Sequence, residues 1–325
     1  MRFLKTSIFS SAALGMLALT ACESENLDVQ PASSDVVQIH ATIGGMDNAN
    51  TRVPVLDENG IGEFQVGDVW DLYVYDAKDW NNYTVHNEPY SYGENTLLWD
   101  EIVGDEVTFT AVYPDMVWLT PRPEQPSALL ELNFLELGNA VDILYASTTV
   151  RRGEPVHLGF RHLMHNIVIN LEAEGPYVTE SELDDAIIEM AGPVGNFVLD
   201  WLTGEIDYDA IPSEDLQYAT WYMNQSRTAS FIVPPQDLRY QLVVEIMLNG
   251  RVAQCQIPLV YTTENTDFLS YRLESGMRHV LNLKLYRNEP AGDLQVTCGD
   301  TYIQSWADRG SMFPTEVDIE LTSVK

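Results

Sequence analysis

The chain has 325 residues, with 49 acidic against 17 basic side chains and a formal net charge of −32. Such a charge repels phosphate backbones, so the composition excludes nucleic acid as a partner. A hydrophobic content of 45% with 10% aromatic residues is enough for packed cores, so the acidic residues predict a solvated surface and not disorder. The length exceeds what one small core accommodates and predicts two domains.

Residues 1–21 have the layout of a secretory signal. Arg2 and Lys5 form a short positive start, and residues 8–19 form an apolar stretch. A helix that crosses a bilayer needs about 20 apolar residues, so this stretch predicts a signal peptide and not a membrane span.

The segment 19–22, Leu-Thr-Ala-Cys, resembles the lipobox of bacterial lipoproteins. The resemblance implies cleavage before Cys22 and attachment of acyl chains such as palmitate, which would hold the mature chain at a membrane surface. Loss of Arg2 and Lys5 takes the net charge from −32 to −34. The acidic residues 23–25 resemble the signal that sends Bacteroidetes lipoproteins to the outside of the outer membrane. We therefore expect a lipid-anchored, surface-exposed protein of the cell outer membrane.

Strand patterns fill the chain after a polar tether over residues 22–35. Residues 36–43 alternate apolar and polar side chains and end at Gly44. Similar runs cover residues 70–75, 107–113, 143–146, 167–171, 186–190, 197–201, 229–233, 242–248, 252–260 and 279–285. Turn residues separate these runs, and no segment has a sustained helical period, although residues 180–185 could form one turn. The pattern predicts antiparallel β-sandwiches, which we place at residues 36–165 and 166–325.

Short sequence pieces follow one another in a recognisable order across nearly the whole mature chain. They are Thr51-Arg52, Phe64-x-x-Gly67-Asp68, Phe109-x-x-x-Tyr113-Pro114, Asp142 to Ala146, Phe160-x-His162, Leu202-Thr203-Gly204, Val233-Pro234-Pro235-Gln236 and Trp306. Together with the lipobox, this order resembles the fimbrillins of Bacteroidetes pili, the Mfa-like group.

The resemblance implies a fold and a function. Fimbrillins have two tandem transthyretin-like antiparallel β-sandwich domains, reach the outer membrane as lipoproteins, and form structural and adhesive pilus subunits without enzymatic activity. The expected partners are other fimbrial subunits and a host or bacterial surface ligand. An arginine-specific protease cuts fimbrillins in the loop that follows the first strand. In this chain the matching arginine is Arg52. After the cut, the protein would enter the fimbrium.

The cut would open a groove for strand exchange. Removal of the strand that carries Val36, Ile39 and Ile43 leaves apolar side chains and unpaired backbone groups for another strand. The alternating segment 317–324, with Val317, Ile319 and Leu321, has the pattern of a donor strand. It could equally be the last strand of its own C-terminal domain, and the sequence leaves stalk, tip and anchor positions open.

Catalytic and metal sites have little support in the sequence. His157, His162 and His165 lie near Glu154 and Glu172, which invites a metal site. Residues at even and odd positions face opposite sides of a strand, so His162 and His165 should not converge. We therefore expect no metal at these residues. The motifs of nucleophilic, zinc-protease and nucleotide sites are missing from the sequence, so we expect no cofactor and no enzymatic activity.

Exposed aromatic residues support an alternative function. Residues 80–83, in an expected loop, and residues 218–222 around Trp221 would suit stacking against sugar rings, so a polysaccharide-binding surface lipoprotein remains open. After lipidation only Cys255 and Cys298 keep free thiols. We expect buried free thiols there, while a disulfide remains possible in an oxidising compartment.

Overall fold

The computed structural model describes residues 35–44, 62–115, 127–133, 141–207, 210–212, 215–223, 225–238, 242–257, 272–305, 315–316 and 322–323. The contacts divide the chain into Met1–Ser34, which lies outside these ranges, and Asp35–Lys325. The structural statements below concern the second unit.

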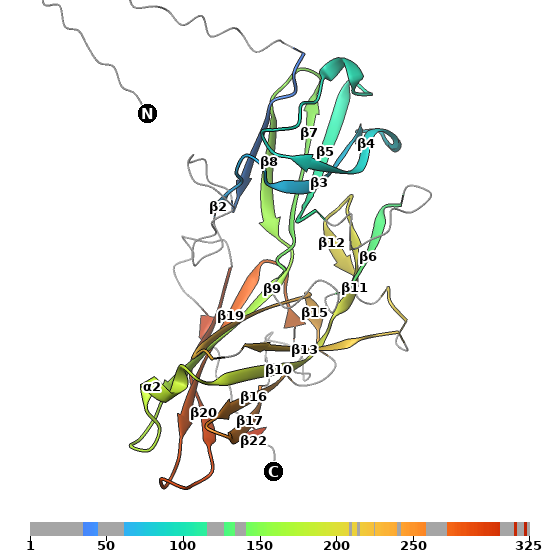
Figure 1. Cartoon of the computed structure of the whole chain (residues 1–325). Helices are drawn as coiled ribbons and strands as arrows, with labels where there is room; N and C mark the ends of the chain where they lie inside the picture. The colour runs from blue at the N-terminus through green and yellow to red at the C-terminus, as the bar shows by residue number, and fades with distance from the viewer. Residues whose placement is uncertain are drawn as a thin grey trace, which may run out of the picture. The chain divides into compact units, whose positions relative to one another are not determined.

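Strands make up most of the described residues, as expected for an all-β protein (Figure 1). The first half contains β1 (Ile39–Ile43), β2 (Gly62–Glu63), β3 (Val69–Asp76), β4 (Asp79–Ser91), the short 3-10 helix η1 (Trp99–Glu101), β5 (Glu106–Tyr113), β6 (Leu129–Asn133), β7 (Leu144–Arg151), β8 (Val156–His162) and β9 (His165–Ala173). The expectation of a loop at residues 80–83 is wrong, because they lie inside β4, which pairs with β3 with three register shifts.

The second half continues with α2 (Glu180–Leu183), β10 (Ile187–Val194), β11 (Asn196–Asp200), β12 (Glu205–Asp207), β13 (Tyr218–Met223), β14 (Thr228–Val233), β15 (Gln236–Asp237), β16 (Leu242–Leu248), β17 (Arg251–Ile257), β18 (Arg272–Leu273), β19 (Met277–Tyr286), β20 (Gln295–Ser305), β21 (Thr315–Glu316) and β22 (Thr322–Ser323). The one-turn helix predicted near residues 180–185 is confirmed as α2. In the described ranges, no helix has the length and hydropathy needed to cross a membrane.

The strands form sheets of seven, five, three, five and two strands. Their orders are β2-β1-β8-β7-β5-β3-β4, β13-β10-β16-β17-β22, β12-β11-β6, β14-β9-β19-β20-β21 and β15-β18. Most pairs are antiparallel, but β1 runs parallel to β8 and β9 runs parallel to β19. The β6–β11 pair joins a strand of the predicted N-terminal domain to one of the predicted C-terminal domain. The boundary at residues 165 and 166 stays a prediction.

The first hydrophobic core, which we call the N-terminal core, lies between β1, β8 and one face of β3 and β5. Its members include Ile43, Leu158, Phe160, Val74 and Phe109, all buried. The alternation of side chains predicts that these residues project from one face of each strand.

The second core uses the other face of β3 and continues through the C-terminal strands. Tyr73 stacks on Trp201, which follows β11, with ring centroids 3.9 Å apart and planes 11° apart. Each face of β3 thus packs against a core, and every residue of β3 except the two at its ends is buried. This explains why the side chains on both faces of the strand are aromatic, aliphatic or hydrogen-bonded.

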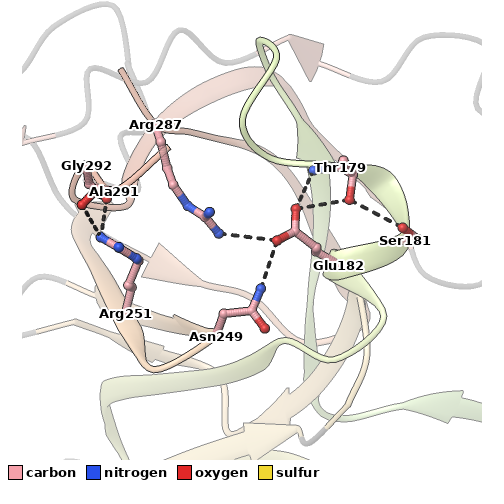
Figure 2. A network of polar contacts seen from close by, with 8 residues as sticks. All are labelled: Thr179, Ser181, Glu182, Asn249, Arg251, Arg287, Ala291 and Gly292. Carbon is pink, nitrogen blue, oxygen red and sulfur yellow. Dashed lines mark hydrogen bonds and ion pairs between the residues drawn. The ribbon is translucent and has the colours of Figure 1, made fainter. Parts of the chain in front are cut away.

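A polar network at the end of the C-terminal strands joins α2 to two hairpins (Figure 2). The Glu182 carboxylate accepts hydrogen bonds from the backbone N–H of Thr179 at 2.8 Å and from Asn249 Nδ2 at 2.9 Å, and it pairs with Arg287 at 3.5 Å. Thr179 and Glu182 form a capping box at the start of α2. The hydrogen bonds from Thr179 and the contact with Arg287 lower the pKa of Glu182, the Thr179 backbone hydrogen bond most of all. One carboxylate thereby fixes the helix, the β16–β17 turn and the end of β19 together.

Candidate functional site

β1 is the strand on which the predicted exchange depends, and it lies between β8 and β2. Its residues Ile39–Ile43 pair in parallel with Val156–Phe160, and Thr42 and Ile43 pair with β2 (Figure 1, the dark-blue strand beside β8). Because β2 has two residues, β1 owes most of its backbone pairing to β8.

Backbone hydrogen bonds on the β8 side extend beyond the strand at both ends. Val156 N–H donates to the Gln38 carbonyl at 2.8 Å, and Gly44 N–H donates to the Phe160 carbonyl at 3.0 Å. Loss of β1 would leave these β8 groups, and those between them, without their present partners.

The segment before β1 is held from another direction. The Asp35 carbonyl accepts a hydrogen bond from Trp99 N–H at 2.7 Å, and Val37 N–H donates to the Leu97 carbonyl at 2.9 Å. Val36 forms an isolated antiparallel bridge with Leu98. The segment 35–44 therefore contacts residues 97–99 with its first residues and β8 with the rest.

Side chains of one parity in this segment enter the N-terminal core. Val37, Ala41 and Ile43 are buried there, and Ile39 is half-buried against it. Val36 is half-buried and has the opposite parity. The sequence therefore indicated Ile39 and Ile43 correctly as apolar strand residues but missed Val37 and Ala41. The strict period of two, counted back from Ile43, would have found both.

An aromatic cluster of the N-terminal core surrounds Phe64, just after β2, and Phe160, near the end of β8. The ring centroids of Phe64 and Phe160 are 4.5 Å apart, and those of Phe64 and Trp70 are 4.9 Å apart. Trp70 and Phe160 are 5.4 Å apart. Phe160 faces Ile43 in the strand register. A groove left by β1 would thus have an aromatic end, which a large apolar side chain of an incoming strand could contact.

The modified and cleaved residues of the prediction lie outside the described ranges. Cys22 belongs to residues 1–34, and Arg52 belongs to residues 45–61, the connection between β1 and β2. The lipidation and the cut stay predictions.

The C-terminal end contacts two sheets of its own chain. β21 pairs with β20 through Tyr302 and Glu316, and β22 pairs with β17 through Cys255 and Ser323. Val317, Ile319 and Leu321 lie between these two short strands and outside the described residues. The flanking pairs agree with the alternative in which the segment folds back on its own subunit.

Residues of the sequence pieces meet in the fold although they lie far apart in the chain. His162 Nδ1 is 2.6 Å from the Asp142 carboxylate. Burial raises the pKa of Asp142, and the interaction with His162 opposes this rise. Tyr145 donates its hydroxyl hydrogen to the Leu202 carbonyl at 2.9 Å. Each of these contacts joins two segments that are separated along the chain.

Gln236, from another of the sequence pieces, also contacts a distant part of the chain, the end of β10. Its buried side chain accepts a hydrogen bond from Val194 N–H at 2.7 Å and donates to the Val194 carbonyl at 2.9 Å. The amide thus replaces a neighbouring strand at the end of β10, which explains why a glutamine follows the two prolines.

Two further buried histidines lie side by side, His165 at the start of β9 and His279 in β19. His165 Nε2 is 2.8 Å from His279 Nδ1, and His165 Nδ1 is 2.9 Å from the Glu274 carbonyl. Complete burial lowers the pKa of His165 to about 4, and burial lowers the pKa of His279 well below its ordinary value. A neutral pair of imidazoles therefore crosses the β9–β19 pair.

The structure separates the three histidines that raised the question of a metal. His157 is exposed, whereas His162 and His165 are buried. Across the part of the chain that the structure describes, no group of three or more His, Cys, Asp or Glu side chains is placed to hold a metal ion.

Two aromatic residues of the alternative function, Trp80 and Trp221, lie in or against the second core. Trp221 is buried, and Trp80 packs against the second core with its ring 5.9 Å from that of Trp201. Tyr83 and Tyr218 are exposed. No pair of exposed aromatic rings in contact appears at residues 80–83.

The two thiols differ in exposure. Cys255 is buried and Cys298 is half-buried, and the two do not form a disulfide with each other. Burial, and next the charge of Cys298, raises the pKa of Cys255 to about 12. Cys255 is therefore a poor nucleophile.

Known proteins resemble the chain in fold and in sequence pattern. One solved structure, a candidate cell adhesion protein from Bacteroides uniformis, has a TM-score of 0.54 and 13% sequence identity, and the match covers 83% of this chain and 99% of that one. A second, a candidate cell adhesion protein from Bacteroides ovatus, has a TM-score of 0.54 and 19% identity, with 83% and 97% covered. None of the curated proteins compared with the chain matches it.

The chain is thus an all-β sandwich protein with the fold of these two structures. The fimbrillin-like family model matches residues 51–306, which is well over half of the chain. The chain belongs to the fimbrillin-like family.

Proposed function

We propose that this protein is an adhesive fimbrial subunit that assembles by strand exchange at the outer-membrane surface. In the proposal, lipid on Cys22 carries the chain to the cell surface, and a protease cuts after Arg52. β1 then leaves with the lipid, and the trimmed chain enters the fimbrium.

The position of β1 carries the proposal. Within the described part of the chain, β1 is the one strand that precedes Arg52, and hydrogen bonds and side-chain packing alone hold it to β8. A single cut between β1 and β2 therefore removes the covalent link of this strand to the sheet. Its buried side chains would leave an apolar groove beside the backbone groups of β8, which is the surface that strand addition requires.

The C-terminal segment 317–324 is the proposed donor. In the free chain the pairs of β21 and β22 hold both ends of this region, but each strand has only two residues. Short pairs of this kind are weak compared with the five-residue register between β1 and β8, so release of the segment is the easier step. The division into domains 36–165 and 166–325 belongs to this proposal, with the groove in the first and the donor in the second.

Treatment of the full chain with an arginine-specific protease tests the proposal. We expect a cut after Arg52, detected by amino-terminal sequencing that begins at Val53, followed by ladders that resist SDS. Arg52→Gln should remain monomeric. Arg151→Gln, which changes an exposed arginine at the end of β7, should form ladders like the wild type. A trimmed chain that retains residues 23–52 and stays monomeric would contradict strand exchange.

A further inference from the structure

Two exposed histidines face each other across the pairing of β1 and β8. The six histidines of the chain all lie in described residues, and only His40 and His157 are exposed. They are register partners in the parallel pair. Their rings stack with centroids 5.1 Å apart and planes 17° apart.

The strand geometry places both rings on the outer face. Ala41 and Leu158, the next residues along each strand, are buried in the N-terminal core. Alternation therefore directs His40 and His157 away from this core, which agrees with their exposure. Because the rings are exposed, both can rotate without disturbing the core.

Adjacent imidazoles of this kind have the chemistry of a metal site. Neutral imidazole nitrogen binds Zn²⁺, Cu²⁺ and Ni²⁺ well. Two nitrogens at about 2.0–2.1 Å from a tetrahedral zinc ion are roughly 3.3 Å apart. Neighbouring strands lie about 4.8 Å apart, so two side chains on facing positions can bring their nitrogens to this separation by rotation.

We propose that His40 and His157 form a binding site for a divalent transition-metal ion, which fastens β1 to β8. Among the described residues no third ligand completes the site, so water fills the other coordination positions. The site is therefore open and exchangeable, unlike a closed structural zinc site with four protein ligands.

A bound ion would act on the stability of the strand pairing. An ion held by both imidazoles binds only while β1 and β8 are paired, so it favours the paired state by mass action. Metal binding itself does not depend on the proposed fimbrial function. If the cut after Arg52 occurs, the bound ion would in addition slow the departure of β1.

Titration of the full chain with zinc chloride tests the site. The protein should carry no affinity tag with histidines, and the buffer should not bind metal. We expect one zinc ion per chain by calorimetry and a rise in the thermal unfolding midpoint that excess EDTA reverses. His40→Thr and His157→Thr should each weaken zinc binding at least tenfold and abolish the rise.

Controls separate the loss of a ligand from damage to the strand. Threonine suits strand positions, and the unfolding midpoint of each variant without zinc reports the remaining damage. Thr42→Ala changes the same face of β1 and should bind zinc like the wild type. Zinc binding that is absent in the wild type, or unchanged in either histidine variant, would overturn the proposal. Neither result would affect the strand-exchange proposal, because no readout involves cleavage or assembly.

Discussion

Gly204, in the turn between β11 and β12, contacts Tyr145 and so links two of the sequence pieces that resemble the fimbrillins. Its φ of +68° is favourable for glycine, and a Cβ built there would lie 2.5 Å from Tyr145 Cδ1. Arg161 Nη2 donates to the Gly204 carbonyl at 2.9 Å and lies over the Tyr145 ring. The glycine of Leu202-Thr203-Gly204 is therefore required by the tyrosine of β7.

We predict that Gly204→Ala destabilises the protein more than Gly250→Ala does. Gly250 has a similar φ of +72° and open space at its Cβ, so its substitution adds only backbone strain of about 1–3 kcal/mol. Gly204→Ala adds overpacking against Tyr145, which costs about 1–3 kcal/mol more. Urea unfolding of both variants measures the difference. Equal losses would show that the Tyr145 ring moves aside freely.

His165 supports a prediction about pH. Its pKa of about 4 in the folded chain is below the ordinary value of 6.5, so the unfolded chain binds more protons between these values. Stability is therefore complete above pH 6.5 and falls as the pH drops towards 4, by on the order of 3 kcal/mol from this group. His279 acts in the same direction.

The variant His165→Gln isolates this contribution. Asp142 has a raised pKa and acts in the opposite direction, so the wild-type profile contains both effects. Urea unfolding from pH 7.5 to 4 should give a flatter curve for His165→Gln, whatever the loss of stability at pH 7.5. Parallel curves for the two proteins would show that His165 titrates normally in the folded chain.

At the scale of elements, β1 shows what a sequence can and cannot predict. The alternation in residues 36–43 predicts the strand, and Ile43 as a buried position follows from it. The pattern carries no information on its partner. The parallel pairing with β8, more than 100 residues later, depends on contacts between distant segments. The facing of His40 and His157 has the same origin and could not be found from spacing.

Polar strands are the other weakness of the sequence prediction. Residues 80–83 contain two asparagines and were expected in a loop, but β4 continues through them because β3 provides backbone partners. Asn87, with φ of +50°, lies buried in the same strand. Tertiary pairing here overrides the low strand propensity of asparagine.

We predict that Ile43→Ala weakens the packing of β1 against the N-terminal core. Ile43 is completely buried, so loss of its side chain should reduce the free energy of unfolding by about 2–5 kcal/mol. Thr42→Ala, at the half-buried neighbouring position, should change it by less than about 1 kcal/mol. Hydrogen exchange of the β8 amides, followed by mass spectrometry, should show faster exchange in Ile43→Ala only. Unchanged exchange would mean that β1 does not protect β8.

At the scale of the whole molecule, the pieces of sequence that suggested the family are points of contact in the fold. Asp142 meets His162, Tyr145 meets Leu202, and Gln236 closes the end of β10. The order of such pieces was therefore sufficient to predict an all-β fimbrillin fold. The division into two domains was less accessible, because β6 pairs with β11 across the expected boundary and the second core includes residues from both sides of it.

The charge of the whole molecule leads to the last prediction, which rests on the proposed assembly. Residues 22–52 carry five acidic side chains and one arginine, so the cut takes the net charge from −34 to −30. Two such subunits repel each other as they approach. The screening length falls from about 30 Å at 0.01 M salt to about 8 Å at 0.15 M, so added salt should accelerate ladder formation several-fold.

This salt dependence distinguishes docking driven by backbone pairing and apolar contacts from docking steered by opposite charges, because steering would slow as salt increases. Chains trimmed beforehand and freed of protease should be transferred to each salt concentration, so that cleavage does not enter the rate. A chain that lacks residues 317–325 should form no ladders at any salt concentration, since it has no donor. Slower assembly of the trimmed wild type at high salt would instead indicate that complementary charged patches on this acidic surface bring the subunits together.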